Sequence, residues 1–117
     1  MLTHTLGFPR IGRHRELKRV VESYWKRDLT AEDLAENCAK LRMVHWRIQK
    51  EAGIDLATVG DFSLYDHMLD TAVMLGCLPE RYGWDGGEVD LETYFALARG
   101  DALKGVTAME MTKWFDT

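Results

Sequence analysis

Apolar residues recur with helical spacing in much of this chain, most clearly between residues 30 and 53. They follow steps of four and three and form one stripe: Leu34, Cys38, Leu41, His45, Ile48 and Ala52. This period predicts an amphipathic helix with the stripe against a core. Thr30 and Asp33 have capping-box spacing at its start, and Gly53 suits its end. We interpret His45 as a core histidine rather than a ligand, because a single histidine on an apolar stripe is usually structural.

Three further helices are expected from the same kind of pattern. The first runs from about residue 13 to residue 26, with apolar side chains on one side. The second begins near Ser63, which has capping-box spacing to Asp66, and its wide apolar surface predicts that it is well buried. Asp90 can cap the third, which should end at Gly100.

Short apolar runs over residues 2–8, 54–60 and 109–115 predict three strands. One or two helices separate each pair of strands, which indicates an α/β fold with a parallel sheet and right-handed crossovers. Ligands gather at the carboxyl ends of such strands. The first two of these ends fall near Phe8 and Asp61.

Composition places the chain among ordinary globular proteins and excludes some functions. The chain has 117 residues, 46% of them hydrophobic, and a formal net charge of −4. This length suits one domain or part of one. The acidic balance argues against a general nucleic-acid-binding protein. We see no apolar run long enough for a membrane helix and no signal peptide, so the expected location is the cytoplasm.

The two cysteines and the catalytic motifs give little sign of chemistry. Cys38 and Cys77 lack a second Cys or a His at metal-ligand spacing, so both are expected to be reduced and buried, and no metal site is expected. A nucleophile elbow, a Walker loop and a dinucleotide fingerprint are all missing. We therefore expect no catalytic residue in this chain.

A basic segment follows the first expected strand and leads into the first expected helix. Its five cationic residues are Arg10, Arg13, Arg15, Lys18 and Arg19. A helix N-terminus offers free N–H groups and a positive dipole, so this segment is a candidate anion site. The alternative is a solvated basic face on an ordinary helix. Lys113, on an otherwise apolar strand, could join the site because a lysine there must reach solvent or meet an anion.

A small acidic cluster with one histidine follows the second expected strand. Asp61, Asp66, His67 and Asp70 could serve in acid–base chemistry. A structural explanation is the stronger one, because Asp66 can cap a helix and Asp61 can bond backbone N–H groups in a turn. His67 and Asp66 are adjacent in sequence and therefore diverge on a helix.

Six blocks of this sequence, in order, resemble the amino terminus of cobalamin-independent methionine synthase. The blocks are LGFPRIG at 6–12, RELK at 15–18, ESYW at 22–25, QKEAGID at 49–55, VGDFSLYDH at 59–67 and EMTKWFDT at 110–117. Together they span nearly the whole chain. The resemblance implies a fold of two facing (β/α)8 barrels, of which residues 1–117 would be the first part of the first barrel, with about three parallel strands and four or more helices.

The resemblance also implies an activity. Enzymes of this family transfer a methyl group from 5-methyltetrahydropteroyltri-L-glutamate to L-homocysteine and make methionine. The second barrel holds zinc and homocysteine, and the first helps to bind the folate polyglutamate. Carried over by position, that binding role falls on Arg15, Glu16, Leu17, Lys18 and Lys113.

The sequence departs from the family pattern because it stops after the third expected strand. We expect the second, catalytic barrel to be absent, so the chain should bind no zinc and should be inactive alone. Homocysteine would bind through the missing domain, and no nucleic-acid or membrane partner is expected. Cut sheet edges predict that the piece forms homo-oligomers. The alternative is a non-catalytic anion-binding or oligomerising module on the same scaffold.

Overall fold

A computed structural model describes residues 1–109 of the chain, and these residues form four α-helices and one short 3-10 helix. In chain order they are α1 (Glu16–Trp25), α2 (Ala31–Glu51), α3 (His67–Met74), the 3-10 helix η1 (Glu80–Tyr82) and α4 (Leu91–Arg99). The chain divides into two compact units, residues 1–64 and the residues from Tyr65 on. Among the described residues, no helix is both long and apolar enough to cross a membrane.

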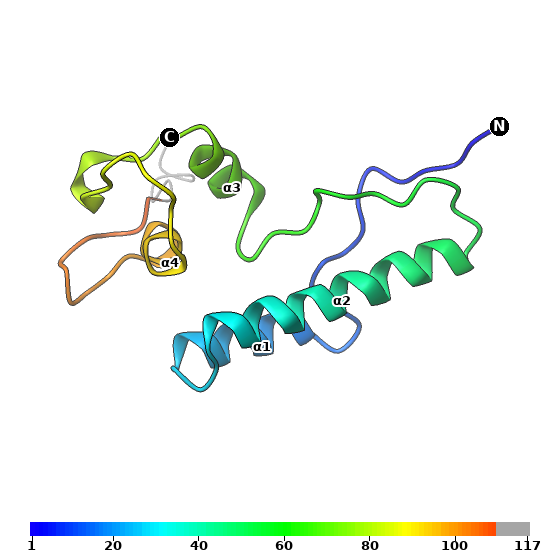
Figure 1. Cartoon of the computed structure of the whole chain (residues 1–117), viewed down its shortest axis with the longest axis horizontal. Helices are drawn as coiled ribbons and strands as arrows, with labels where there is room; N and C mark the ends of the chain where they lie inside the picture. The colour runs from blue at the N-terminus through cyan, green and yellow to red at the C-terminus, as the bar shows by residue number, and fades with distance from the viewer. Residues whose placement is uncertain (110–117) are drawn as a thin grey trace, which may run out of the picture. The chain divides into compact units, whose positions relative to one another are not determined.

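The first unit is built on a pair of helices, α1 and α2, which lie side by side (Figure 1). Leu17 and Val21 on α1 are buried, as are Leu34 and Cys38 on α2. These positions give each helix an apolar stripe, which is what two amphipathic helices need to pack. The apolar sides that were expected on both helices therefore face a shared core in this unit.

The start of α2 confirms the capping box that was expected at Thr30 and Asp33. The Thr30 hydroxyl accepts the Asp33 N–H at 3.1 Å, and the Asp33 carboxylate accepts the Thr30 N–H at 3.0 Å. These bonds lower the pKa of Asp33 below its ordinary value. Two N–H groups that the helix cannot pair are thereby satisfied. At the other end, Gly53 takes a positive φ of 82°, as expected of a residue that ends a helix.

The buried stripe of α2 differs from the expected one in its second half. His45 is buried, as expected, but the next buried residue is Gln49, whereas Ile48 is 44% exposed. The reason is polar: Gln49 bonds Thr5 and Thr58, two residues of the segments that lie along α2. A hydrogen-bonding requirement has overridden the hydrophobic period at this position.

The predicted fold class is wrong for the described residues. A three-stranded parallel sheet, the first part of a (β/α)8 barrel, was expected, but residues 1–109 contain no sheet. The first two expected strands meet at a single parallel bridge between His4 and Leu56. An antiparallel bridge joins Asp101 and Val106. Apart from Met109, which is not in a strand, the third expected strand lies outside the described residues.

Side chains, rather than a ladder of backbone bonds, join the two extended segments. The Thr3 N–H and hydroxyl both donate to Asp55 Oδ2, at 2.8 and 2.9 Å. The Thr58 N–H donates to Gln49 Oε1 at 3.4 Å, and one backbone bond runs from the Leu56 N–H to the Thr3 carbonyl at 3.1 Å. A regular ladder needs successive backbone pairs. Here the polar side chains take partners that a ladder would use, so the pairing ends after one bridge.

The second unit contains α3, η1 and α4, and its core is α4. Residues 94–98 of α4 are all buried, and the Met109 N–H donates to the Leu97 carbonyl at 2.7 Å. The expected start of this helix is confirmed, because Asp90 Oδ1 accepts the Thr93 N–H at 2.7 Å. Its expected end at Gly100 is confirmed as well.

The expectation for α3 was partly wrong. The helix begins at His67 instead of near Ser63, because Asp66 is its N-cap and accepts the Leu69 N–H at 2.8 Å. Only Leu69 is buried, whereas Met68 and Met74 are both 76% exposed. Asp66 therefore acts as the cap itself rather than as the distal partner of a capping box.

Candidate functional site

The basic segment before α1 folds into a closed turn, and the helix starts later than expected. The Arg15 N–H donates to the Gly12 carbonyl at 3.1 Å, and the Leu17 N–H donates to the Ile11 carbonyl at 3.1 Å. Helix α1 then begins at Glu16 rather than near residue 13. Arg15 is the N-cap residue and has left-handed backbone angles, φ 60° and ψ 39°. An L-residue other than glycine is strained there, so the surrounding turn must hold it in place.

The carboxylate of Glu16 occupies the positive end of α1. Its Oε2 accepts the His14 N–H at 2.9 Å. The backbone N–H of Glu16 itself also donates to this carboxylate. These two backbone bonds are the main causes that lower the pKa of Glu16, and charge attraction from His14 and Arg19 adds to them. The helix end is the part of the segment where an anion was expected to sit. An anion does sit there, and it is the protein's own.

Gly12 leaves the space that the Glu16 carboxylate needs. A Cβ built on Gly12 would overlap Glu16 Oε2 and come within 3.2 Å of Leu41 Cδ1. The φ of Gly12 is also 86°, a conformation that suits glycine. Both facts make glycine the residue that allows this closed turn.

The structure brings four of the five predicted site residues together and places the side chains differently. Arg15 and Lys18 are exposed, and Lys18 Nζ lies 3.6 Å from Glu22 Oε1 one turn along the helix. Leu17 is 4% exposed, so its side chain is part of the core. Lys113 lies outside the described residues. The candidate site is therefore a pair of exposed cations beside a carboxylate that is already bonded.

One further cation of the segment is used within the turn. Arg19 Nη2 donates to the His14 carbonyl at 3.0 Å. This bond links the first turn of α1 to the loop before it, on the same residue whose N–H bonds Glu16. Arg19 therefore stabilises the turn as well as adding positive charge to it.

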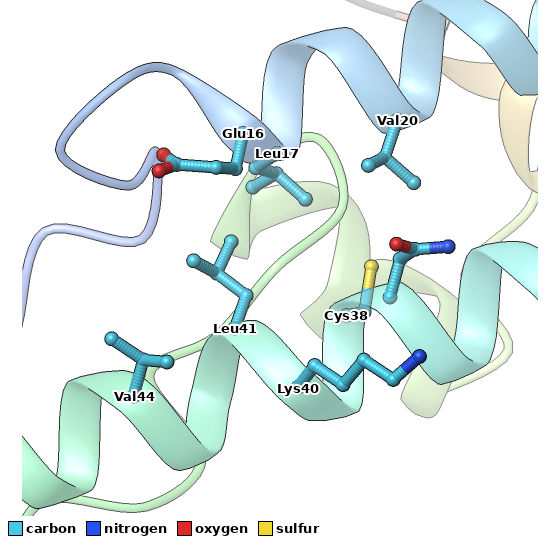
Figure 2. A pocket seen from close by; sticks show the side chains of 8 residues that line it. Glu16, Leu17, Val20, Cys38, Lys40, Leu41 and Val44 are labelled. Atoms are coloured by element: carbon cyan, nitrogen blue, oxygen red, sulfur yellow. The ribbon is translucent and has the colours of Figure 1, made fainter.

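An apolar groove of about 230 Å³ lies between α1 and α2, next to the turn (Figure 2). Its lining residues are Glu16, Leu17, Val20, Asn37, Cys38, Lys40, Leu41 and Val44. Figure 2 shows Leu17, Val20 and Leu41 turned toward one another, while the Glu16 carboxylate turns toward the preceding loop. The groove is smaller than usual small-molecule pockets. Its chemistry is that of a packing seam.

The two cysteines are free and lie in different environments. Burial raises the pKa of the Cys38 thiol, and the charge of Arg42 only partly opposes this effect, so the thiolate is disfavoured. Cys77 is exposed, contrary to the expectation of burial. In residues 1–109, no three His, Cys, Asp or Glu side chains are grouped so as to hold a metal ion. The described residues therefore do not form a zinc site of their own, and the resemblance places the zinc of full-length enzymes in the second barrel.

Sequence reasoning missed a cluster around His45. The His45 ring lies 4.9 Å from the Phe8 ring, and the Phe8 N–H donates to Asp61 Oδ2 at 2.7 Å. Burial lowers the pKa of His45, while the negative charges of Asp61 and Glu16 act in the opposite direction. Phe8 and Asp61 come from the ends of the first two expected strands. Their position at those ends was the only sequence signal that the two residues would lie near each other. For His45 the sequence offered no signal of this cluster beyond its place on the apolar stripe of α2.

The acidic residues that were candidates for acid–base work have structural partners. Asp61 bonds the Phe8 N–H, and Asp66 caps α3. Asp70 Oδ1 accepts the Tyr94 hydroxyl at 2.6 Å, which joins α3 to α4. His67 is exposed at the first position of α3. The structural interpretation of this cluster accounts for each carboxylate.

Comparison with known proteins gives a consistent result. Residues 2–117 match the family described as "Cobalamin-independent synthase, N-terminal domain". A protein of Syntrophotalea carbinolica is 62% identical over 118 residues, which cover 100% of this chain and 16% of that protein. Relatives from Acidithiobacillus ferrooxidans and Salinibacter ruber are 59% and 57% identical, over 97% and 96% of this chain and 14% and 16% of theirs. All three are named 5-methyltetrahydropteroyltriglutamate–homocysteine methyltransferase. The chain thus spans less than a fifth of the length of these relatives.

Proposed function

The chain belongs to the family described as "Cobalamin-independent synthase, N-terminal domain". On that premise we propose that it serves methyl transfer from 5-methyltetrahydropteroyltriglutamate to homocysteine. The product of this transfer is methionine. The relatives' shared name supports the reaction. The chain's own contribution is to hold the folate polyglutamate tail, and the homocysteine and its zinc belong to a part of the enzyme outside these residues.

The exposed cations beside the start of α1 support a role in binding the tail. A polyglutamate tail carries several carboxylates, and charge-assisted bonds from Arg and Lys are the usual way to hold them. Arg15 and Lys18 lie at one end of α1, and both are exposed. Lys113 is included in the proposed site by its place in the family motif. The other part of the binding energy must come from elsewhere in the enzyme, because this segment is open to solvent.

Lys18 already has a partner on α1, the carboxylate of Glu22. Lys18 Nζ is 3.6 Å from Glu22, and both side chains are about half exposed. A surface pair of this kind contributes little to stability. A ligand carboxylate can therefore replace Glu22 as the partner of Lys18 at small cost.

A chimeric enzyme tests this function. The chain would replace the matched region of the Syntrophotalea carbinolica relative, which aligns with all of it. The chimera should make methionine, and Lys18→Ala should weaken its affinity for the triglutamate folate roughly tenfold while sparing the monoglutamate form. Lys40→Ala is the matched control, since Lys40 is an exposed lysine paired with Glu36 on α2. An equal loss for both folates in the Lys18 variant would refute the tail-binding role.

The chain without the rest of the enzyme should not transfer methyl groups. The reaction requires an activated homocysteine thiolate, and the described residues do not group into a metal site that could generate one. Purified chain should therefore release no methionine from the two substrates, and elemental analysis should find well under one zinc per chain. The proposal would be contradicted if metal-free chain formed methionine at a rate proportional to the concentration of the chain.

The non-catalytic module is the second possibility, and the chimera separates it from the first. The exposed Leu6 and Val59 favour association with other surfaces. If the chimera folds, retains its metal and still makes no methionine, this chain has lost the family's function. An active chimera excludes the module as a full description.

A further inference from the structure

The carboxylate of Glu16 stands where an anionic ligand of a helix N-terminus would stand. It accepts the His14 N–H at 2.9 Å, and Figure 2 shows it turned to the loop rather than to the groove. A bound tail would therefore find these backbone N–H groups already used. The cationic side chains around them are what remains for a ligand.

Glu16 also holds the turn in which Arg15 is strained. The turn closes through Arg15 N–H to the Gly12 carbonyl, and Glu16 packs against Gly12 so closely that no Cβ fits between them. Arg15 keeps its left-handed conformation without a side-chain cap of its own. Strain of this size persists only where neighbouring contacts fix the backbone. The carboxylate of Glu16 is the contact that spans the turn.

We propose that Glu16 is a positioning residue for the polyglutamate site: its carboxylate binds the turn 12–16 and thereby fixes the direction in which Arg15 leaves the helix start. This inference rests on the proposed tail-binding function and refines it. Glu16 then acts through the backbone and not by touching the ligand. Charge repulsion alone would have the opposite effect, because a negative charge beside a polyanion should weaken binding.

The two expectations differ in sign, and a binding experiment on this chain can separate them. The probe is γ-linked triglutamate, titrated into the isotope-labelled chain and followed by the backbone amide signals of residues 12–19, with free glutamate as the reference ligand. The wild-type chain should prefer triglutamate. Glu16→Ala should lower that preference roughly tenfold, although it removes a negative charge. Glu16→Gln keeps an oxygen that can accept the His14 N–H and should retain most of the preference.

A control for charge alone lies further along α1, at Glu22. Glu22→Ala also removes one carboxylate near Lys18, so it should leave the preference unchanged or raise it. A preference in Glu16→Ala equal to or above that of the wild-type chain would overturn the proposal. If the wild-type chain shows no preference for triglutamate, the proposed role of Glu16 in this chain is refuted, while the chimera tests the tail-binding function separately. If Glu16→Ala merely lost its structure, it would bind triglutamate and glutamate equally more weakly. Selective recovery of triglutamate binding in Glu16→Gln would not then be expected.

Discussion

The backbone N–H of Phe8 donates to Asp61 Oδ2 at 2.7 Å, across 53 positions of sequence. This bond joins the ends of the two extended segments and places the Phe8 ring against His45. Asp61→Ala should lower the free energy of unfolding by about 1.5–3 kcal/mol, the usual range for a bond to a charged group. Urea unfolding followed by circular dichroism would measure it.

The matched control for that prediction is Asp61→Asn. It keeps an acceptor oxygen but no charge, so it should cost roughly half as much as the Ala variant. If Ala and Asn variants both unfold at the wild-type midpoint, the bond contributes nothing to stability.

Arg27 occupies a position where glycine should be more stable than alanine. It lies two residues after the end of α1 and has a φ of 65°, and its N–H donates to the Tyr24 carbonyl at 2.9 Å. Glycine is the residue that this position favours. The free energy of unfolding of Arg27→Gly should exceed that of Arg27→Ala by about 1 kcal/mol. Its midpoint in urea should therefore be higher. The comparison is made with Ala because both variants lose the Arg side chain and differ only at Cβ. Equal midpoints would show that the left-handed backbone costs nothing here.

His45 should make the chain less stable at mildly acidic pH. Burial lowers its pKa in the folded chain below the ordinary value of 6.5. As the pH falls through 6.5, the unfolded chain takes up the proton first. The stability that the neutral His45 contributes is therefore fully present above pH 6.5. It is lost as the pH falls from 6.5 toward the lower pKa of His45 in the folded chain. Wild-type chain should lose more unfolding free energy between pH 7.5 and 5.5 than His45→Gln, which cannot titrate. Parallel losses in the two proteins would contradict this.

Exposed apolar residues on the extended segments predict that the chain associates in solution. Leu6 is 97% exposed and Val59 is 70% exposed. Apolar surface of this kind is usually covered by a partner. Light scattering after size exclusion at micromolar concentration should give a mass above one chain, and Leu6→Asp combined with Val59→Asp should lower it. Leu103→Asp is the control, because Leu103 is fully exposed in a separate turn. A single-chain mass at all concentrations would rule association out.

The helix ends were predictable because their chemistry is local. Thr30 and Asp33 are three residues apart and satisfy each other's N–H groups, so the start of α2 is determined by four residues of sequence. The same holds for Asp90 at the start of α4. Sheet formation is different, because a strand is stable only with backbone partners from other parts of the chain. The two segments at residues 2–8 and 54–60 have one such contact, and side chains take the rest.

The sequence predicted a basic segment before α1, but it did not predict the geometry of that segment. The cluster of cations before α1 could be read from sequence, since charge needs no folding to be counted. The left-handed Arg15 and the bonded Glu16 could not, because both depend on a turn that closes through Gly12. Local spacing therefore predicts a cluster of cations at this place, and only the folded turn shows which of its polar atoms are already bonded.

The contacts of Thr3 with Asp55 also set an order of events during protein synthesis. The two residues are 52 positions apart, so the amino-terminal segment leaves the ribosome long before its partner exists. At about 5–20 residues per second, the delay is roughly 3–10 s. Helices α1 and α2 are neighbours in sequence and can pair within that time. The growing chain therefore holds the amino-terminal segment unfixed beside a formed helical hairpin, and its bonds to Asp55 and Thr58 can form only at the end of this interval.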